Sequence, residues 1–192
     1  MKNILILCTA NSARSILGEA ILAKFGEGRV NAYSAGSSPR GTPNPDGIAL
    51  LEDCGYDTSG LRSKSWDAFE GETAPKMDIV ITVCDNAAGE TCPLWPGAPV
   101  QAHWGIPDPA GTGETDAERR AAFAETYRLL VIRVLALMAL QFRRYAGSQV
   151  YIFDQGNSAS AAVLAMGGEH YALGAAPDDA KNALAFQPLR DI

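Results

Sequence analysis

The stretch ILILCTANSARS, residues 4 to 15, decides the fold: an apolar run ends on Cys8, and Arg14 follows after a gap of five residues. A continuous apolar run is typical of a strand buried on both faces of a parallel sheet. After Ser15, apolar side chains recur at helical spacing until Gly26, a residue suited to end a helix. The stretch therefore predicts a strand, a short loop and a helix in succession.

The chemistry of this loop points to an oxyanion. A loop that enters a helix N-terminus directs backbone N–H groups into one concavity, and Arg14 can add a two-pronged donor. The same donors stabilise a negative sulfur, so we expect Cys8 to be a nucleophile that receives a hydrogen bond from Ser15. The alternative is a buried strand-end cysteine with an unrelated surface arginine. The predicted oxyanion-binding residues are Thr9, Ala10, Asn11, Ser12, Ala13, Arg14 and Ser15.

The rest of the chain alternates between strand and helix patterns. Strands are expected at 30–36, at 77–84 and from 100, and helices at 45–55 and 115–145. This alternation predicts an α/β fold with a parallel sheet, in which ligands bind beyond the carboxyl ends of the strands. Cys8, Cys84 and the loop that carries Asp108 all follow strands. We therefore expect these three groups at one edge of the sheet.

Composition limits the class of protein. The 192 residues are 47% hydrophobic, which suits one globular domain with an added segment. The formal net charge of −6 makes binding to nucleic acid or to an anionic membrane unfavourable, so we expect neither partner. The longest apolar run, 129–140, contains Arg133 and is too short to span a bilayer. The N-terminus lacks a signal-peptide cleavage site, and we expect a cytoplasmic monomer.

The cysteines show no metal-binding pattern. Four are present: Cys8, Cys54, Cys84 and Cys92. No pair has the C-x2-C spacing of a zinc site, and His103 and His170 are not at ligand spacing, so no metal is expected. A disulfide framework is also unexpected without a secretion signal. Buried thiols or catalytic thiols remain, and we interpret Cys54, near a helix end, as a packing residue.

Four motifs together resemble a known family. ILILCTANSARS, VNAYSAGSSP, DIVITVCDNAAGETCP and AHWGIPDPAG, spread over about residues 3–145, resemble the low-molecular-weight protein tyrosine phosphatase superfamily, and more closely its arsenate reductase branch. The resemblance implies a small four-stranded parallel sheet flanked by helices in three layers over residues 1–146. Residues 147–192 would be a C-terminal extension. The implied function is reduction of arsenate to arsenite in arsenic detoxification.

The resemblance also implies a cysteine relay. Cys8 attacks arsenate, and Asp108 protonates the arsenate oxygen that leaves as water. Cys84 then attacks Cys8, which expels arsenite and leaves a Cys8–Cys84 disulfide. Cys92 attacks Cys84 in turn. No cofactor is tightly bound, and an external reductant, either thioredoxin or glutathione with glutaredoxin, reduces the Cys84–Cys92 disulfide.

Two other functions remain open. A phosphatase acting on small phosphate esters or phosphotyrosine would share the loop and the acid. Ala110 follows the Asp108–Pro109 pair where related tyrosine phosphatases have an aromatic residue, and this favours a small inorganic substrate. The second alternative is a non-catalytic oxyanion-binding protein that uses Cys84 and Cys92 as a redox sensor.

Several residues are expected to support the site. We predict that Asn11 tolerates a left-handed conformation in the middle of the loop and braces it together with Ser34. We interpret His103 as packing rather than catalytic. The stretch around Trp66, which includes Lys64, is expected to lie over the pocket.

The tail has a different character. Residues 148–192 include QVYIFDQGNSASAAVLAMGGEHYALG, which resembles a segment of the conjugative-transfer ATPases of type IV secretion systems. The phosphate-binding motif G-x-x-x-x-G-K-[ST] is missing from the sequence, so ATP hydrolysis is not expected. We interpret the tail as a fragment fused to the reductase domain, with little core of its own.

Overall fold

The computed structural model describes residues 1–71, 73–85, 87, 95 and 97–142, together with two short strands. The chain divides into two compact units, Met1–Val134 and Leu135–Ile192, and the division lies inside helix α4 (Asp116–Phe142). In the second unit, β5 (Ala172–Leu173) pairs in parallel with β6 (Ala183–Leu184). The predicted boundary between residues 146 and 147 and all of the tail motif except Ala172–Leu173 lie outside the described residues.

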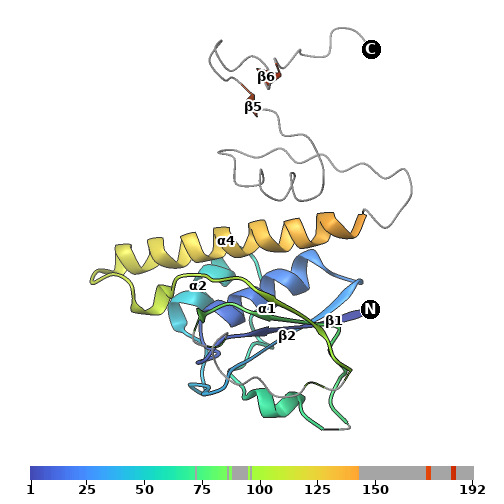
Figure 1. The fold of residues 1–192 in the computed structure, drawn as a ribbon. Helices are drawn as coiled ribbons and strands as arrows, with labels where there is room; N and C mark the ends of the chain where they lie inside the picture. Colours follow the sequence, from blue (N-terminus) through green and yellow to red (C-terminus); the bar gives the residue numbers. More distant parts are fainter. Residues whose placement is uncertain are drawn as a thin grey trace. The chain divides into compact units, whose positions relative to one another are not determined.

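Four strands of the first unit form a parallel sheet in the order β2–β1–β3–β4 (Figure 1). Their bounds are Lys2–Leu7 for β1, Val30–Ala35 for β2, Ile79–Thr82 for β3 and Val100–His103 for β4. The register pairs Leu7 with Ala35 and with Thr82, and pairs Thr82 with His103. All four carboxyl ends therefore lie at one edge, and the predicted α/β fold with a four-stranded parallel sheet is confirmed.

Helices cover the face of the sheet that carries Ile6. A Cβ added to Gly18 of α1 (Arg14–Phe25) would lie 2.8 Å from Ile6 Cδ1 and 3.6 Å from Leu130 Cδ2 of α4. A Cβ added to Gly47 of α2 (Pro45–Asp53) would lie 3.1 Å from a ring carbon of Phe123, also in α4. The helices pack so closely at these points that only glycine fits without a shift of its neighbours.

Local signals explain the helix limits. Asn44 caps α2 by accepting a hydrogen bond from Asp46 N, Pro45 occupies the first turn, and Gly55 adopts a φ of +72° just past the end. In the described part of the chain, no helix has an apolar stretch long enough to cross a bilayer.

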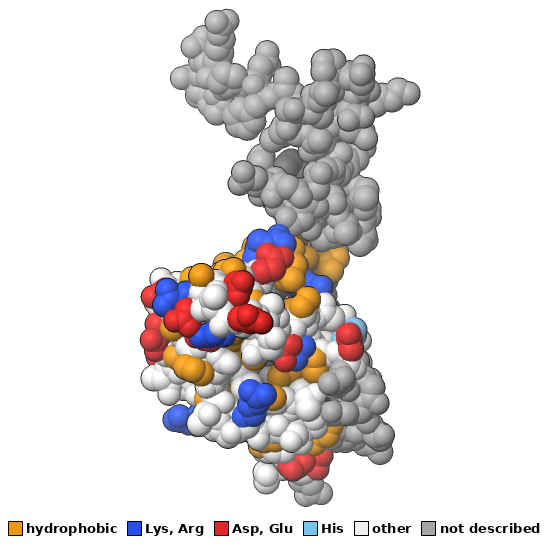
Figure 2. Space-filling view, turned by 90° about the vertical axis from the view of Figure 1, so that its left-hand side faces the viewer, with side chains coloured by type: hydrophobic (Ala, Val, Ile, Leu, Met, Phe, Trp, Pro, Cys, Tyr) orange, Lys and Arg blue, Asp and Glu red, His pale blue; other side chains and the backbone are white. Residues whose placement is uncertain are grey.

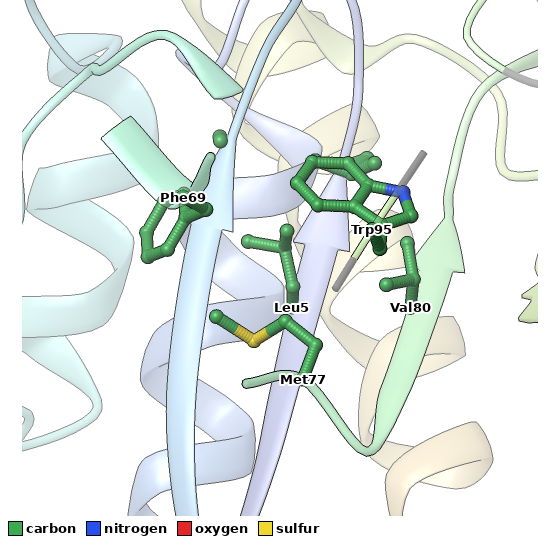
Figure 3. Close-up of a cluster of buried hydrophobic side chains, with 7 residues drawn as sticks. Leu5, Phe69, Met77, Val80 and Trp95 are labelled. Atoms are coloured by element: carbon green, nitrogen blue, oxygen red, sulfur yellow. The ribbon is translucent and has the colours of Figure 1, made fainter. Parts of the chain in front are cut away.

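The opposite face of the sheet is covered by a hydrophobic cluster (Figure 3). Leu5 and Leu7 alternate along β1 with the helix-facing Ile6, because successive side chains of a strand point to opposite faces. Phe69 of the short 3-10 helix η1 (Trp66–Phe69) packs here, and so does Trp95. The central strand β1 is thus buried on both sides, as its continuous apolar run predicts.

Candidate active site

The loop between β1 and α1 turns its carbonyl groups outward. Three of them accept hydrogen bonds from the segment 38–44: Ser38 N to Thr9 O (2.9 Å), Arg40 N to Ala10 O (3.0 Å) and Asn44 N to Ser12 O (2.8 Å). The C=O and N–H of a trans peptide point in opposite directions, so the N–H groups that follow these carbonyls face the other side of the loop. Helix α1 begins at Arg14 without a side-chain cap from Ala13. The loop therefore has the outward-facing carbonyls and uncapped helix start that an oxyanion cradle requires.

The candidate nucleophile receives an oriented hydrogen bond. The thiol of Cys8 is buried, and its Sγ lies 3.0 Å from Oγ of Ser15. Asn11 Nδ2 donates to Ser15 Oγ at 2.9 Å and to Ser34 Oγ at 2.9 Å. An amide NH2 group can only donate, so Ser15 Oγ accepts from Asn11 and keeps its own proton for the sulfur. This arrangement directs a hydrogen-bond donor at the sulfur of Cys8.

A buried network fixes the orientation of Asn11. Its Oδ1 accepts a hydrogen bond from Lys64 N at 2.7 Å, which places the NH2 group toward the two serines. Ser34 Oγ in turn donates to Glu19 Oε2, and Lys64 Nζ lies 3.3 Å from the same oxygen. Asn11 and Ser34 thus brace the loop as predicted. No sequence pattern singles out Glu19, and Lys64 contacts both Asn11 and Glu19.

Backbone geometry also shapes the loop. Asn11 is fully buried with a φ of +40°, in the left-handed region that Asn tolerates better than most residues. Gly36, directly after β2, has no Cβ at a point where one would lie 2.4 Å from Thr9 O and 2.8 Å from Cys8 O. The end of β2 can therefore approach the loop only because residue 36 is a glycine.

The predicted arginine and acid lie together. Arg14 Nη2 forms an ion pair with Asp108 Oδ2 at 3.1 Å, and Arg14 Nη1 donates to Ile106 O at 3.0 Å. Asp108 also begins the short 3-10 helix η2 (Pro109–Gly111), where its Oδ1 accepts from Ala110 N at 3.2 Å. The carboxylate is half exposed: Oδ2 contacts Arg14, and Oδ1 caps the 3-10 helix that follows it.

A second thiol lies at the same edge of the sheet. Cys84 follows β3 and is buried, and its Sγ accepts a hydrogen bond from Ala87 N at 3.4 Å. Thr9 Oγ1 lies 3.7 Å from this sulfur, so Cys84 contacts the residue next to Cys8. Both cysteines are free thiols. The third predicted relay residue, Cys92, lies outside the described residues.

The structure corrects two sequence interpretations. Cys54 is exposed at the C-cap of α2, so its assignment as a packing residue is wrong: the side chain at this helix end is open to solvent. The ring of His103 is also well exposed rather than packed, and it contacts Thr82 and Asp85 on either side of Cys84. Among the residues that the structure describes, no group of three or more His, Cys, Asp or Glu side chains could hold a metal ion.

Charge on the surface is mixed. Figure 2 shows positive side chains scattered among acidic and uncharged ones on the face that it presents. An anion must therefore be met by a local site, and Arg14 at the uncapped start of α1 supplies one.

Comparisons with known proteins agree with this geometry. The profile of the family described as low molecular weight phosphotyrosine protein phosphatase matches residues 3–144. An arsenate reductase of Halalkalibacterium halodurans is 37% identical over 122 residues, which are 64% of this chain and 84% of the relative.

Two solved structures extend the comparison. An arsenate reductase in its phosphate-binding state has a TM-score of 0.57 at 27% identity, over 72% of this chain and 98% of that one. A thioredoxin-dependent arsenate reductase of Corynebacterium glutamicum has a TM-score of 0.51 over 72% of this chain and 60% of that one, and at 22% identity it shows a shared fold alone.

Proposed function

The chain belongs to the low-molecular-weight phosphotyrosine protein phosphatase family, and we propose that it is an arsenate reductase that converts arsenate to arsenite with its own cysteine thiols. One observation carries the proposal: the buried thiol of Cys84 lies 3.7 Å from Thr9 Oγ1, beside the nucleophile Cys8. Phosphoester hydrolysis needs one thiol, whereas reduction of arsenate needs two thiols that can form a bond. The arsenate reductase relative at 37% identity supports the same function.

The first step uses the loop and Asp108. The thiolate of Cys8 attacks arsenic, and an arsenate oxygen leaves as water after it receives a proton from Asp108. Arg14 and the N–H groups of the loop bind the remaining oxygens and stabilise their negative charge. Arsenic remains As(V) in the resulting Cys8–arsenic adduct.

The second step transfers electrons from the two cysteine sulfurs to arsenic. The thiolate of Cys84 attacks the sulfur of Cys8, and the sulfur–arsenic bond breaks with its electron pair moving to arsenic. Arsenic leaves as As(III) in arsenite, while the two thiols become a Cys8–Cys84 disulfide. Two electrons are transferred in all, one from each sulfur.

The third step restores Cys8. Cys92 attacks Cys84 and displaces the thiolate of Cys8, which leaves a Cys84–Cys92 disulfide. A dithiol carrier such as thioredoxin, or glutathione with glutaredoxin, then reduces this disulfide. The chemistry needs a reducing compartment, and we place the enzyme in the cytoplasm.

Arsenite production tests the proposal. The full chain is assayed with thioredoxin and its reductase, and separately with glutathione and glutaredoxin. We expect multiple turnovers with one of these systems, loss of turnover in Cys84→Ser and Cys92→Ser, and normal turnover in Cys54→Ser, whose thiol is exposed on α2.

Two outcomes would replace the proposal. Arsenite formation under neither system, with steady hydrolysis of an aryl phosphate that survives Cys84→Ser, would identify a phosphatase, since Cys8, Arg14 and Asp108 suffice for that reaction. Oxyanion binding without turnover on either substrate would identify a binding protein.

A further inference from the structure

One imidazole ring contacts the chain on both sides of Cys84. His103 is the last residue of β4, and its Nδ1 lies 2.8 Å from Thr82 Oγ1, at the end of β3. Its Nε2 lies 3.1 Å from Oδ1 of Asp85, the residue directly after the cysteine. His103 therefore bridges the position two before Cys84 and the position one after it.

The surrounding backbone leaves room for this bridge. A Cβ on Gly105 would lie 3.1 Å from His103 Nε2 and 3.2 Å from Asp85 Oδ1, tighter than ordinary contact with both partners. Arg133 of α4 donates from both of its terminal nitrogens to Gly105 O at 3.2 Å. The turn after β4 is thus held in the position that allows the ring to reach Asp85.

The contacts are chemically consistent. A carboxylate can only accept, so His103 Nε2 donates to Asp85. A hydroxyl can donate or accept, so Thr82 Oγ1 is a suitable partner for Nδ1. Each ring nitrogen therefore has a hydrogen-bonding partner.

We propose that His103 is a positioning residue for Cys84: by holding Thr82 and Asp85, it keeps the thiol buried and directed toward Thr9. Consecutive Cα atoms are separated by about 3.8 Å, so a shift of Asp85 moves Cys84 with it. The thiol itself forms hydrogen bonds with Ala87 N at 3.4 Å and with Thr9 Oγ1 at 3.7 Å. The contacts of His103 with Thr82 and Asp85 add to these by fixing the backbone from which the thiol projects. This inference rests on the proposed function, in which Cys84 is the resolving thiol.

The rate at which a small alkylating reagent modifies Cys84 tests the proposal. The full chain carrying Cys92→Ser is reduced and treated with iodoacetamide without arsenate, and the modified Cys84 is quantified by mass spectrometry. His103→Ala should raise the rate about three- to fivefold, the size expected for loss of a hydrogen-bonded contact that restrains local opening. His103→Gln keeps a donor for Asp85 and should restore most of the protection. Gln101→Ala, exposed on the same strand, should change nothing.

A double-mutant cycle guards against a general loss of structure. Asp85→Ala removes one of the two contacts of the ring and should accelerate alkylation no more than His103→Ala, which removes both. The double variant should equal His103→Ala, because the contact with Asp85 is already lost in that variant. Three results would contradict the positioning role of His103. They are additive effects of the two substitutions on the rate of Cys84 alkylation, an equal increase of that rate in Gln101→Ala, and a failure of His103→Gln to lower it.

The outcome is separable from the proposed function. The alkylation assay contains no arsenate, so protection of Cys84 by His103 can be established in a chain that forms no arsenite. Conversely, if the His103→Ala variant produces arsenite normally and its Cys84 is alkylated at an unchanged rate, the proposed reductase function is kept and the positioning role of His103 is wrong.

Discussion

Arg14 and Asp108 form an ion pair at the loop: Nη2 of the guanidinium lies 3.1 Å from Oδ2 of the carboxylate. The arginine side chain is mostly buried, at 16% exposure, whereas the carboxylate is 51% exposed. An oxyanion that binds the loop must therefore compete with Asp108 for the guanidinium. This competition makes the substitution of Asp108 informative.

Asp108→Asn should separate binding from catalysis. Loss of the negative charge frees Arg14, so phosphate or arsenate should bind several-fold more tightly in a calorimetric titration. Arsenite formation should fall by about 10²- to 10⁴-fold, the usual contribution of a general acid. Asp53→Asn on α2 controls for net charge. Weaker oxyanion binding by Asp108→Asn would show that the ion pair does not oppose the ligand.

Substitutions of Asn11 should separate backbone strain from hydrogen bonding. Asn11→Ala removes three buried hydrogen bonds and places alanine at a φ of +40°. We expect a loss of about 2–4 kcal/mol in the free energy of unfolding. Asn11→Gly removes the same hydrogen bonds but relieves the strain, and it should be about 1 kcal/mol more stable than Asn11→Ala. Equal stabilities in urea titrations would show that the positive φ carries no strain.

Gly36→Ala should damage the loop directly. The new Cβ would lie within 3 Å of three backbone atoms, Thr9 O, Cys8 O and Asn11 N, and no rotamer change can relieve a backbone clash. We expect a loss of about 1–3 kcal/mol in stability, together with weaker oxyanion binding. Gly60→Ala is the matched control, because its Cβ would meet no atom within 4 Å. A Gly36→Ala variant as stable and active as Gly60→Ala would contradict the close approach of β2.

Trp95 should tolerate phenylalanine better than alanine. The indole is 6% exposed in the cluster with Leu5, Met77 and Val80 (Figure 3), and in the described part of the chain its Nε1 has no hydrogen-bond partner. Trp95→Phe removes this unpaired group and keeps an aromatic ring, so we expect a change within about 1 kcal/mol. Trp95→Ala should cost about 3–5 kcal/mol. Thermal and urea unfolding would show whether the two variants differ in this order.

Tyr56 should make stability sensitive to alkaline pH. Burial, and then the hydrogen bond with Tyr127 at 3.0 Å, raise the pKa of Tyr56 above its ordinary value. The folded chain therefore holds this proton more tightly than the unfolded chain. The resulting stability is complete below about pH 10 and is lost as the pH rises further. Wild-type stability should fall more steeply above that pH than that of Tyr56→Phe, which keeps the ring beneath Lys24. Parallel profiles would show that Tyr56 ionises equally in both states.

The fold could be predicted because its signals are local. The strand expected at 30–36 is β2, Val30–Ala35, and the helix expected at 45–55 is α2, Pro45–Asp53. Apolar runs and turn residues specify such elements within a few neighbours along the chain. The parallel order of the strands then places Cys8 and Cys84 at one edge without further information.

The supporting contacts could not be predicted in the same way. Lys64 reaches Asn11 through a backbone N–H, which any residue at that position could supply. His103 contacts Asp85 because β3 and β4 are neighbouring strands in a fixed register. The sequence around a single histidine does not indicate which distant residue it will contact. Such contacts depend on the order and register of strands, and these are set by the whole core.

The network around Asn11 has a consequence for the newly made chain. Ser15 is directed at Cys8 only while Asn11 is held by Ser34 of β2 and by the backbone of Lys64. A chain that has formed only β1 and α1 has a serine hydroxyl free to rotate and a cysteine without its oriented donor. Cys8 therefore receives its hydrogen bond from Ser15 only when folding is complete. An unfinished or damaged chain lacks this activated thiol, which oxidants and electrophiles in the cell could otherwise modify.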